Sequence, residues 1–237
     1  MLEHFEHPYS LLFLTLGGSR AYGIASDASD YDVRGVHRLS LPHLLGLGGG
    51  GDTVEIRPEE RTEVATHDLR KFILLLLKGN GNVLETLYAP TVFLDHPLRS
   101  ELGALAQGCI SKRCAAHYRG MAYNQPLALQ KNEVKRLLHC YRCLLTGIHL
   151  MRTHKLVLDV PTLAKEYGYG EVFSLIEAKR AGETAVSVSG HQFALEQLND
   201  ILDEETELSK LPDFTSKQTR DDLEHLLLRV RMEDRDL

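Results

Sequence analysis

The sequence predicts an α+β fold, in which a small mixed β-sheet with helices is followed by a helical domain. Three observations support this prediction. The apolar run at 11–16 is short and ends in two glycines, which is typical of a buried strand. Residues 53–56 and 61–66 have the pattern of the two arms of a β-hairpin. After Pro97 the apolar residues recur at helical spacing.

The length of the chain fits this division. A chain of 237 residues is long enough for two small domains or one large one with a sizeable core. The pattern changes from mixed to helical near residues 95–110. We therefore expect a first domain over residues 1–100 and a helical domain over residues 101–237.

The charge and the distribution of apolar residues limit the partners. The formal net charge is −6 at pH 7. Broad, non-specific nucleic-acid binding normally requires a basic surface, so this charge argues against it and leaves room only for a local basic groove. No apolar run reaches the length of a membrane span, and the first residues lack the apolar core of a signal peptide. We expect a cytoplasmic protein with no membrane partner.

The first strand leads directly into Gly17, Gly18 and Ser19. Glycine adopts backbone angles that other residues avoid and lets a ligand approach the main chain closely. We expect a short helix from about Arg20, whose first N–H groups and dipole would face an anion. This stretch therefore predicts a phosphate cradle.

The next strand carries Asp30 and Asp32 at a spacing of two. Alternate side chains of a strand share a face, so both carboxylates and Arg34 should point to the same side. Two close carboxylates repel each other unless a cation lies between them, and Mg²⁺ (with Mn²⁺ as the alternative ion) takes oxygen ligands and bridges to phosphates. Paired carboxylates beside a phosphate cradle suit metal-dependent phosphoryl or nucleotidyl transfer. The alternative is a glycine turn beside two solvated aspartates.

The remaining elements of the first domain are short. The hairpin arm at 61–66 should lie beside the strand of Asp32. In chain order we expect a brief helix, a glycine-rich loop, the hairpin, a helix ended by Gly79, a second helix and a last strand: 40–45, 46–51, 53–66, 69–78, 82–87 and 91–94.

The second domain is predicted to consist of helices only. The expected helices cover residues 98–108, 111–124, 127–152, 170–180, 192–209 and 217–232. All four cysteines fall in this half of the chain. Cys140 and Cys143 have a spacing that zinc sites use, but zinc ligands usually lie on turns, whereas these two lie within a leucine-rich helix. We interpret them as buried thiols.

Two motifs carry a resemblance to a known family. The segments GGSRAYG (17–23) and SDYDVRG (29–35) resemble the DNA polymerase β-type nucleotidyltransferase superfamily, whose signature is a strand, a Gly-Ser turn and Asp-x-Asp about ten residues later. With LRKFILLLLKGNGNVLETLYAP (69–90), they are more similar to a bacterial and phage subfamily linked by name to RNA repair. Gly81 replaces the proline that this subfamily usually has.

The resemblance implies a third carboxylate on a strand beside Asp32. In the superfamily this group orients or activates the attacking hydroxyl. The distance from the LRKF motif points to Glu63, although the subfamily more often has aspartate there. Asp68 is the alternative, yet its position at a helix start suits a capping role. The implied catalytic and metal-binding residues are Asp30, Asp32 and Glu63.

The nucleotide-binding residues come partly from the motifs and partly from helical spacing. Lys135, His139 and Arg142 occupy positions i, i+4 and i+7 of one predicted helix, and the subfamily shows a similar basic pattern there. Such groups could hold the triphosphate and neutralise the leaving pyrophosphate, although most such triplets form a solvated basic face. The candidate nucleotide-binding residues are Gly18, Ser19, Arg20, Lys78, Asn80, Lys135, His139 and Arg142. For Lys78 and Asn80, helix capping and a tight turn are the equal alternative.

The sequence therefore predicts an Mg²⁺-dependent, template-independent nucleotidyltransferase. It would transfer the nucleoside monophosphate of a nucleoside triphosphate, such as ATP, to an acceptor hydroxyl and release pyrophosphate. An RNA end is the favoured acceptor because of the subfamily's name. The alternatives are a catalytically idle nucleotide- or RNA-binding module and a protein-modifying nucleotidyltransferase of a toxin–antitoxin pair.

Overall fold

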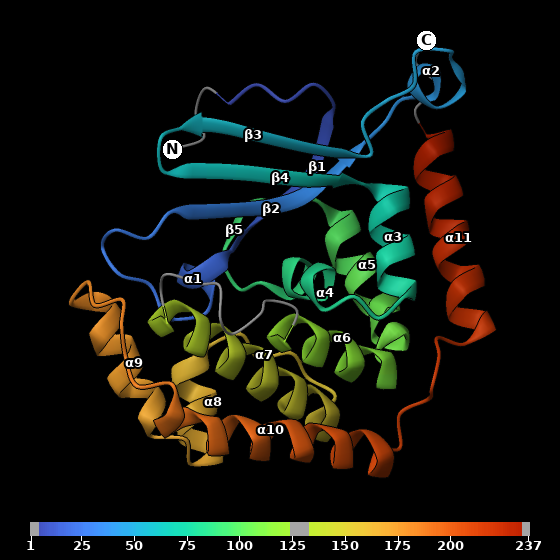
Figure 1. Cartoon of the computed structure of the whole chain (residues 1–237). Helices are drawn as coiled ribbons and strands as arrows, with labels where there is room; N and C mark the ends of the chain where they lie inside the picture. Colours follow the sequence, from blue (N-terminus) through green and yellow to red (C-terminus); the bar gives the residue numbers. More distant parts are fainter. Residues whose placement is uncertain (1–4, 124–132, 234–237) are drawn as a thin grey trace. The chain divides into compact units, whose positions relative to one another are not determined.

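The structure is a computed structural model that describes residues 5–123 and 133–233 (Figure 1). Packing divides the chain into two compact units. Of the described residues, the sheet unit contains 5–18, 30–110 and 214–233, and the helical unit contains 19–29, 111–123 and 133–213. The division into domains at residue 100 stays a prediction, because compact packing units are not by themselves domains.

The sheet unit is built on a five-stranded mixed sheet, as the α+β prediction requires. Its strands are β1 (Ser10–Gly17), β2 (Tyr31–Arg38), β3 (Thr53–Glu59), β4 (Thr62–Asp68) and β5 (Val92–Leu94). The strand order is β3-β4-β2-β1-β5 (Figure 1). Strands β2 and β4 run parallel, and the other neighbours are antiparallel. The predicted hairpin and its place beside the strand of Asp32 are confirmed.

Alternation along β4 explains which side chains the sheet presents. Thr62, Val64, Thr66 and Asp68 are buried, whereas the residues between them are only half-buried. A period of two is the geometry of a strand with one covered face. Glu63 therefore lies on the more exposed face.

Helices cover the other side of this sheet. They are α3 (Leu69–Leu77), α4 (Gly81–Tyr88) and α5 (Pro97–Ala106). The sheet unit also contains α2 (Leu41–Leu45) and α11 (Lys217–Met232), and it includes Gly18, the first residue of the short α1 (Gly18–Ala21). Helices α3, α4 and α5 contact the sheet, and α11 packs on α3 and α5 (Figure 1). Gly79 ends α3 with a φ of 72°, which a residue with a Cβ rarely adopts.

The C-terminal helix is fixed to the sheet by a buried ion pair. The Arg231 guanidinium donates to both carboxylate oxygens of Asp68 at 2.7 and 2.6 Å. The same carboxylate caps α3 by accepting from the backbone N–H of Arg70 at 3.0 Å. The two side chains of the pair are 8% and 4% exposed. Loss of one partner would leave a buried charge, so this pair ties α11 to β4 and α3.

The helical unit is centred on α7 (Glu133–Thr153), of whose 21 residues 16 are buried. Around it pack α6 (Lys112–Tyr123), α8 (Val160–Tyr167), α9 (Glu171–Arg180) and α10 (Ser189–Leu208). The predicted helices match these elements except for α8, which the sequence analysis missed. The part of the predicted 127–152 helix before Glu133 lies outside the described residues.

The four cysteines are buried thiols outside any disulfide, as expected for a helical core. Across residues 5–123 and 133–233, no helix has the length and apolar character that crossing a membrane requires.

Candidate active site

Two candidate carboxylates lie side by side on the parallel strands β2 and β4. The register pairs Asp32 directly with Glu63. Arg34, two residues along β2, contacts both of them. Its Nη2 lies 3.1 Å from an Asp32 carboxylate oxygen and its Nη1 lies 2.8 Å from a Glu63 carboxylate oxygen. The alternation of side chains along the strand predicted that Arg34 and Asp32 share a face, and this ion pair confirms it.

Asp30 lies at the start of this arrangement rather than within it. The β2 ladder begins at Tyr31, whose N–H donates to the carbonyl of Arg61 at 2.8 Å. Asp30 therefore precedes the strand by one residue. Its side chain is 67% exposed, and its carboxylate lies 3.9 Å from Nε of Arg61.

The electrostatics of Glu63 favour its charged form. The hydrogen bond from Arg34 lowers the pKa of the Glu63 carboxyl more than partial burial raises it, and the charges of Arg34 and Arg57 lower the pKa further. Arg57 is a looser neighbour, with Nη2 3.5 Å from the other Glu63 oxygen and a side chain 77% exposed. Glu63 is therefore ionised at neutral pH and can accept hydrogen bonds.

The glycines before the second motif bring the main chain against Asp32. A Cβ built on Gly18 would lie 1.8 Å from Oδ2 of Asp32, and Gly18 has a φ of 63°. Both the close approach and the left-handed backbone require glycine. The glycine that the sequence analysis assigned to a ligand's approach thus also makes room for a candidate metal-binding carboxylate.

The donor set is chemically suited to a divalent cation. Asp32 and Glu63 converge on one positive group, the Arg34 guanidinium, and carboxylate oxygens are the ligands that Mg²⁺ prefers. Among the described residues, no three His, Cys, Asp or Glu side chains are gathered closely enough to hold an ion. Two of the three candidate metal-binding carboxylates, Asp32 and Glu63, thus already lie on either side of the Arg34 guanidinium. The third candidate, Asp30, does not contact Arg34 in this way.

Asp68, the alternative third carboxylate, occupies a different environment. It pairs with His37 in the strand register, whereas Glu63 pairs with Asp32 at the other end of β4. Its two oxygens are taken up by Arg231, by the N–H of Arg70 and by the N–H of Leu39 at 3.1 Å. Asp68 is thus a structural capping residue, as its position at a helix start predicted.

Lys78 and Asn80 lie in the turn between α3 and α4. The Asn80 side chain accepts from the N–H groups of Asn82 and Val83 at 2.9 and 3.3 Å, which caps α4. Lys78 is exposed and forms the C-terminal cap of α3. The capping interpretation describes both residues, and a nucleotide contact stays a prediction.

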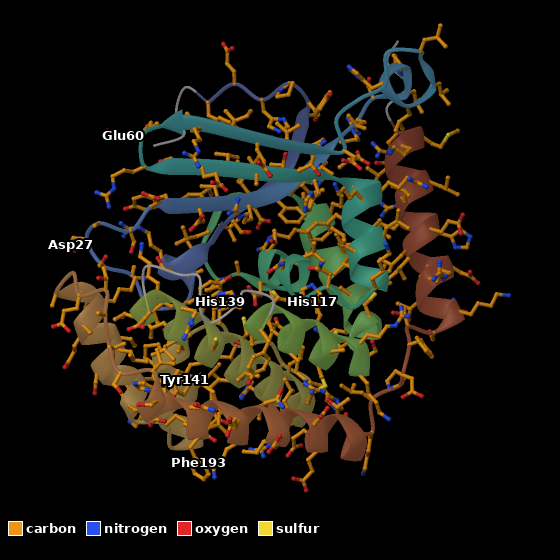
Figure 2. All side chains as sticks on the ribbon, in the orientation of Figure 1. Asp27, Glu60, His117, His139, Tyr141 and Phe193 are labelled. Atoms are coloured by element: carbon orange, nitrogen blue, oxygen red, sulfur yellow. The ribbon has the colours of Figure 1, made fainter. Side chains whose placement is uncertain are left out.

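The predicted basic residues of α7 differ in exposure. Lys135 is exposed, His139 is half-buried and Arg142 is buried. Nε2 of His139 lies 3.0 Å from the carbonyl of Met121 (Figure 2 labels His139 on α7). The Arg142 guanidinium lies over the Tyr22 ring, 4.3 Å from its centroid. This helix face is therefore not a uniformly solvated one.

Segment 19–29 joins the two motifs and packs within the helical unit. The Tyr22 carbonyl accepts from the N–H of Val160 at 3.0 Å, and the Ile24 carbonyl accepts from Lys179 at 2.7 Å. Within the segment, Arg20 donates to the Ser29 carbonyl at 2.7 Å. Ser19 and Arg20, two predicted phosphate ligands, belong to this segment. No motif in the sequence indicated these long-range contacts.

Strand β1, the glycine turn after it, and Asp30 and Asp32 further along the chain define a class of protein. They are the parts of a DNA polymerase β-like nucleotidyltransferase fold. A match to the RNA repair pathway DNA polymerase beta family, RlaP, spans residues 2–229. The chain belongs to this family, which is of the polymerase-β-like nucleotidyltransferase type, as the motif resemblance predicted.

Two curated proteins are similar to the chain. The uncharacterized protein MJ0002 of Methanocaldococcus jannaschii is 27% identical over 144 residues, which span 58% of each protein. The uncharacterized protein YcgL of Bacillus subtilis is 26% identical over 239 residues, covering 92% of this chain and 91% of the relative. The match thus spans little more than half of the archaeal protein and nearly all of the bacterial one.

Proposed function

We propose that the protein is a metal-dependent, template-independent nucleotidyltransferase that acts on an RNA end. One observation carries the proposal: the parallel register of β2 and β4 sets Glu63 beside Asp32, and both carboxylates share one cationic neighbour. The family name supplies the RNA acceptor. The net charge of −6 limits the RNA contact to a local surface.

The reaction would be an in-line displacement at the α-phosphorus of a nucleoside triphosphate. The oxygen of the acceptor hydroxyl forms the new P–O bond, the bond to the β-phosphate breaks, and pyrophosphate leaves. A divalent cation such as Mg²⁺ or Mn²⁺, held by Asp30, Asp32 and Glu63, would supply charge neutralisation on both oxygens. Glu63, whose carboxyl is ionised at neutral pH, would accept the hydrogen bond of the attacking hydroxyl and orient it.

The glycine turn would provide the phosphate contact of the sheet unit. Because Gly18 lacks a Cβ, its main chain lies directly against the Asp32 carboxylate, so a phosphate bound by the backbone N–H groups of this turn would lie near a proposed metal ligand. Ser19 and Arg20 follow in the chain and would add a hydroxyl and a positive charge. Lys78 and the three basic residues of α7 remain predicted nucleotide contacts.

The test is transfer of label from each of the four α-³²P nucleoside triphosphates to RNA or protein acceptors in Mg²⁺. Asp32→Asn and Glu63→Gln remove one negative charge each and keep the side-chain size. Glu60→Gln is the matched control, because Glu60 is exposed in the turn between β3 and β4 of the same hairpin (Figure 2). We expect transfer to RNA by the unaltered protein and Glu60→Gln, and a loss of more than about a hundredfold in the other two.

Each other outcome has a defined meaning. Label on protein instead of RNA would reject the RNA acceptor and favour the protein-modifying alternative. Nucleotide binding without transfer would favour the idle binding module. Equal transfer by Asp32→Asn and the unaltered protein would place the chemistry elsewhere and refute the proposal.

A further inference from the structure

Every carboxylate of the candidate site has an arginine beside it. Arg34 contacts Asp32 and Glu63, Arg57 contacts Glu63, and Arg61 lies near Asp30. The three arginines are not equivalent. Arg34 makes two short contacts with separate nitrogens, and its side chain is 33% exposed. Arg57 makes one longer contact and is mostly exposed.

The two terminal nitrogens of the Arg34 guanidinium contact two carboxylates that the strand register places side by side. Asp32 and Glu63 are direct cross-strand neighbours on parallel strands, so their carboxylates lie on the same face. Two neighbouring carboxylates repel each other, and a planar guanidinium with two donor nitrogens can hold both at once. The Arg34 stem also lies close to the glycine turn, because a Cβ on Gly17 would be 3.0 Å from Cγ of Arg34. The Arg34 stem therefore lies against the glycine turn, and its guanidinium reaches both carboxylates.

We propose that Arg34 is a positioning residue that bridges Asp32 and Glu63 when no divalent cation is bound and competes with that cation for their oxygens. The inference rests on the proposed function, which assigns both carboxylates to the metal. It adds that metal binding breaks the two contacts of Arg34. The bridge keeps the carboxylates aligned in the metal-free protein and weakens metal affinity.

Competition and simple charge effects predict different results for conservative variants. Arg34→Gln removes the charge and the fork. Arg34→Lys keeps the charge, but a single ammonium replaces the two separate nitrogens that now hold the two carboxylates. Arg57→Gln removes an equal charge beside the same Glu63 without removing a bridge. If the role of Arg34 is purely electrostatic, Arg34→Lys should bind the divalent cation with the same affinity as the unaltered protein.

The measurement is Mn²⁺ binding to the full chain, with free Mn²⁺ followed by electron paramagnetic resonance. Two partly exposed ion pairs together account for about tenfold in an equilibrium constant. We expect Mn²⁺ affinity to rise about tenfold in Arg34→Gln and about threefold in Arg34→Lys, and by less than about twofold in Arg57→Gln. Thermal unfolding is the second readout. Without metal, Arg34→Gln should have a lower Tm than the unaltered protein. Saturating Mn²⁺ should raise the Tm of Arg34→Gln by more than it raises the Tm of the unaltered protein.

The results separate this inference from the proposed function. If Arg34→Lys binds Mn²⁺ like the unaltered protein, or if Arg34→Gln changes the Mn²⁺ affinity no more than Arg57→Gln does, the bridge is refuted, even if label transfer is intact. If Arg34→Gln binds Mn²⁺ more weakly than the unaltered protein, the competition is also refuted. If no protein binds Mn²⁺ and none transfers label, the metal site and the proposed function both fail.

Discussion

Glu63 and Asp68 lie on the same strand, and the structure predicts opposite consequences for neutralising them. Glu63 faces the candidate site beside Asp32, whereas Asp68 is buried under α11 with Arg231. The variants Glu63→Gln and Asp68→Asn each remove one negative charge with almost no change of volume. We expect the first to lose activity and keep stability, and the second to lose stability and keep the activity of its folded fraction.

The magnitudes follow from the two environments. The Glu63 side chain is 34% exposed, and a partly exposed ion pair contributes about 0–1 kcal/mol, so Glu63→Gln should change the free energy of unfolding by at most about 1 kcal/mol. Asp68 and Arg231 are 4% and 8% exposed, and breaking a buried pair costs about 3–5 kcal/mol. An amide at position 68 can still accept the N–H of Arg70 and cap α3, so the loss of the cap adds little.

The assay combines urea unfolding with label transfer on the same preparations. Arg231→Met serves as a second probe of the buried pair, and the double variant with Asp68→Asn should cost less than the sum of the single variants, because the pair is shared. Stability losses of less than about 1 kcal/mol in Asp68→Asn, or loss of activity in its folded fraction, would refute the assignment of Asp68 to structure. Full activity of Glu63→Gln would remove Glu63 from the mechanism.

Three further changes test other parts of the structure. Burial lowers the pKa of His37 to about 4, so its stabilising effect is complete above its ordinary pKa of 6.5 and is lost as pH falls towards 4. His7 and His67 also have lowered pKa values and keep their own pH dependence, so the loss of stability between pH 7 and pH 5 in urea unfolding should be smaller by about 2 kcal/mol in His37→Gln than in the unaltered protein; equal pH dependence in both would contradict this. Gly18→Ala places a Cβ against Asp32 and should reduce label transfer about a hundredfold, whereas an unchanged rate would show that the turn adjusts freely. Arg142→Met removes the contact over Tyr22 and should cost about 2 kcal/mol in urea unfolding, with a smaller cost when Tyr22→Leu is already present; additive costs would show that the two side chains are not coupled.

The elements that the sequence predicted are those whose signals are local. The strand at β1, the hairpin of β3 and β4, and the helix ended by Gly79 each depend on a few neighbouring residues, and the structure confirms them. Helix α8 was missed although its ends have clear signals. Asp159 accepts from the N–H of Thr162, a proline follows Asp159 in the first turn, and Gly168 ends the helix with a φ of 81°. The helix has only eight residues, and short helices have a weak periodic pattern.

The environment of the candidate site was harder to predict, because it depends on long-range pairing. The spacing of Asp32 and Arg34 placed them on one face, but only the register of β2 with β4 brings Arg34 to Glu63. Arg142 illustrates the same limit in the helical unit. Helical spacing placed it with Lys135 and His139, and no local signal indicated that it would be buried over Tyr22.

The parallel pairing of β2 and β4 explains why the three candidate carboxylates differ in freedom. Asp32 and Glu63 are on paired strands, so the ladder fixes the backbone positions of both. Asp30 precedes the first ladder bond, and its side chain is exposed. An ion held by all three would therefore recruit Asp30 to a pair that the sheet has already aligned. This step moves a side chain that is 67% exposed and lies 3.9 Å from Arg61, which costs less than moving a strand. The energetic obstacle to metal binding is thus the Arg34 bridge, and the measurement on Arg34→Lys tests that obstacle directly.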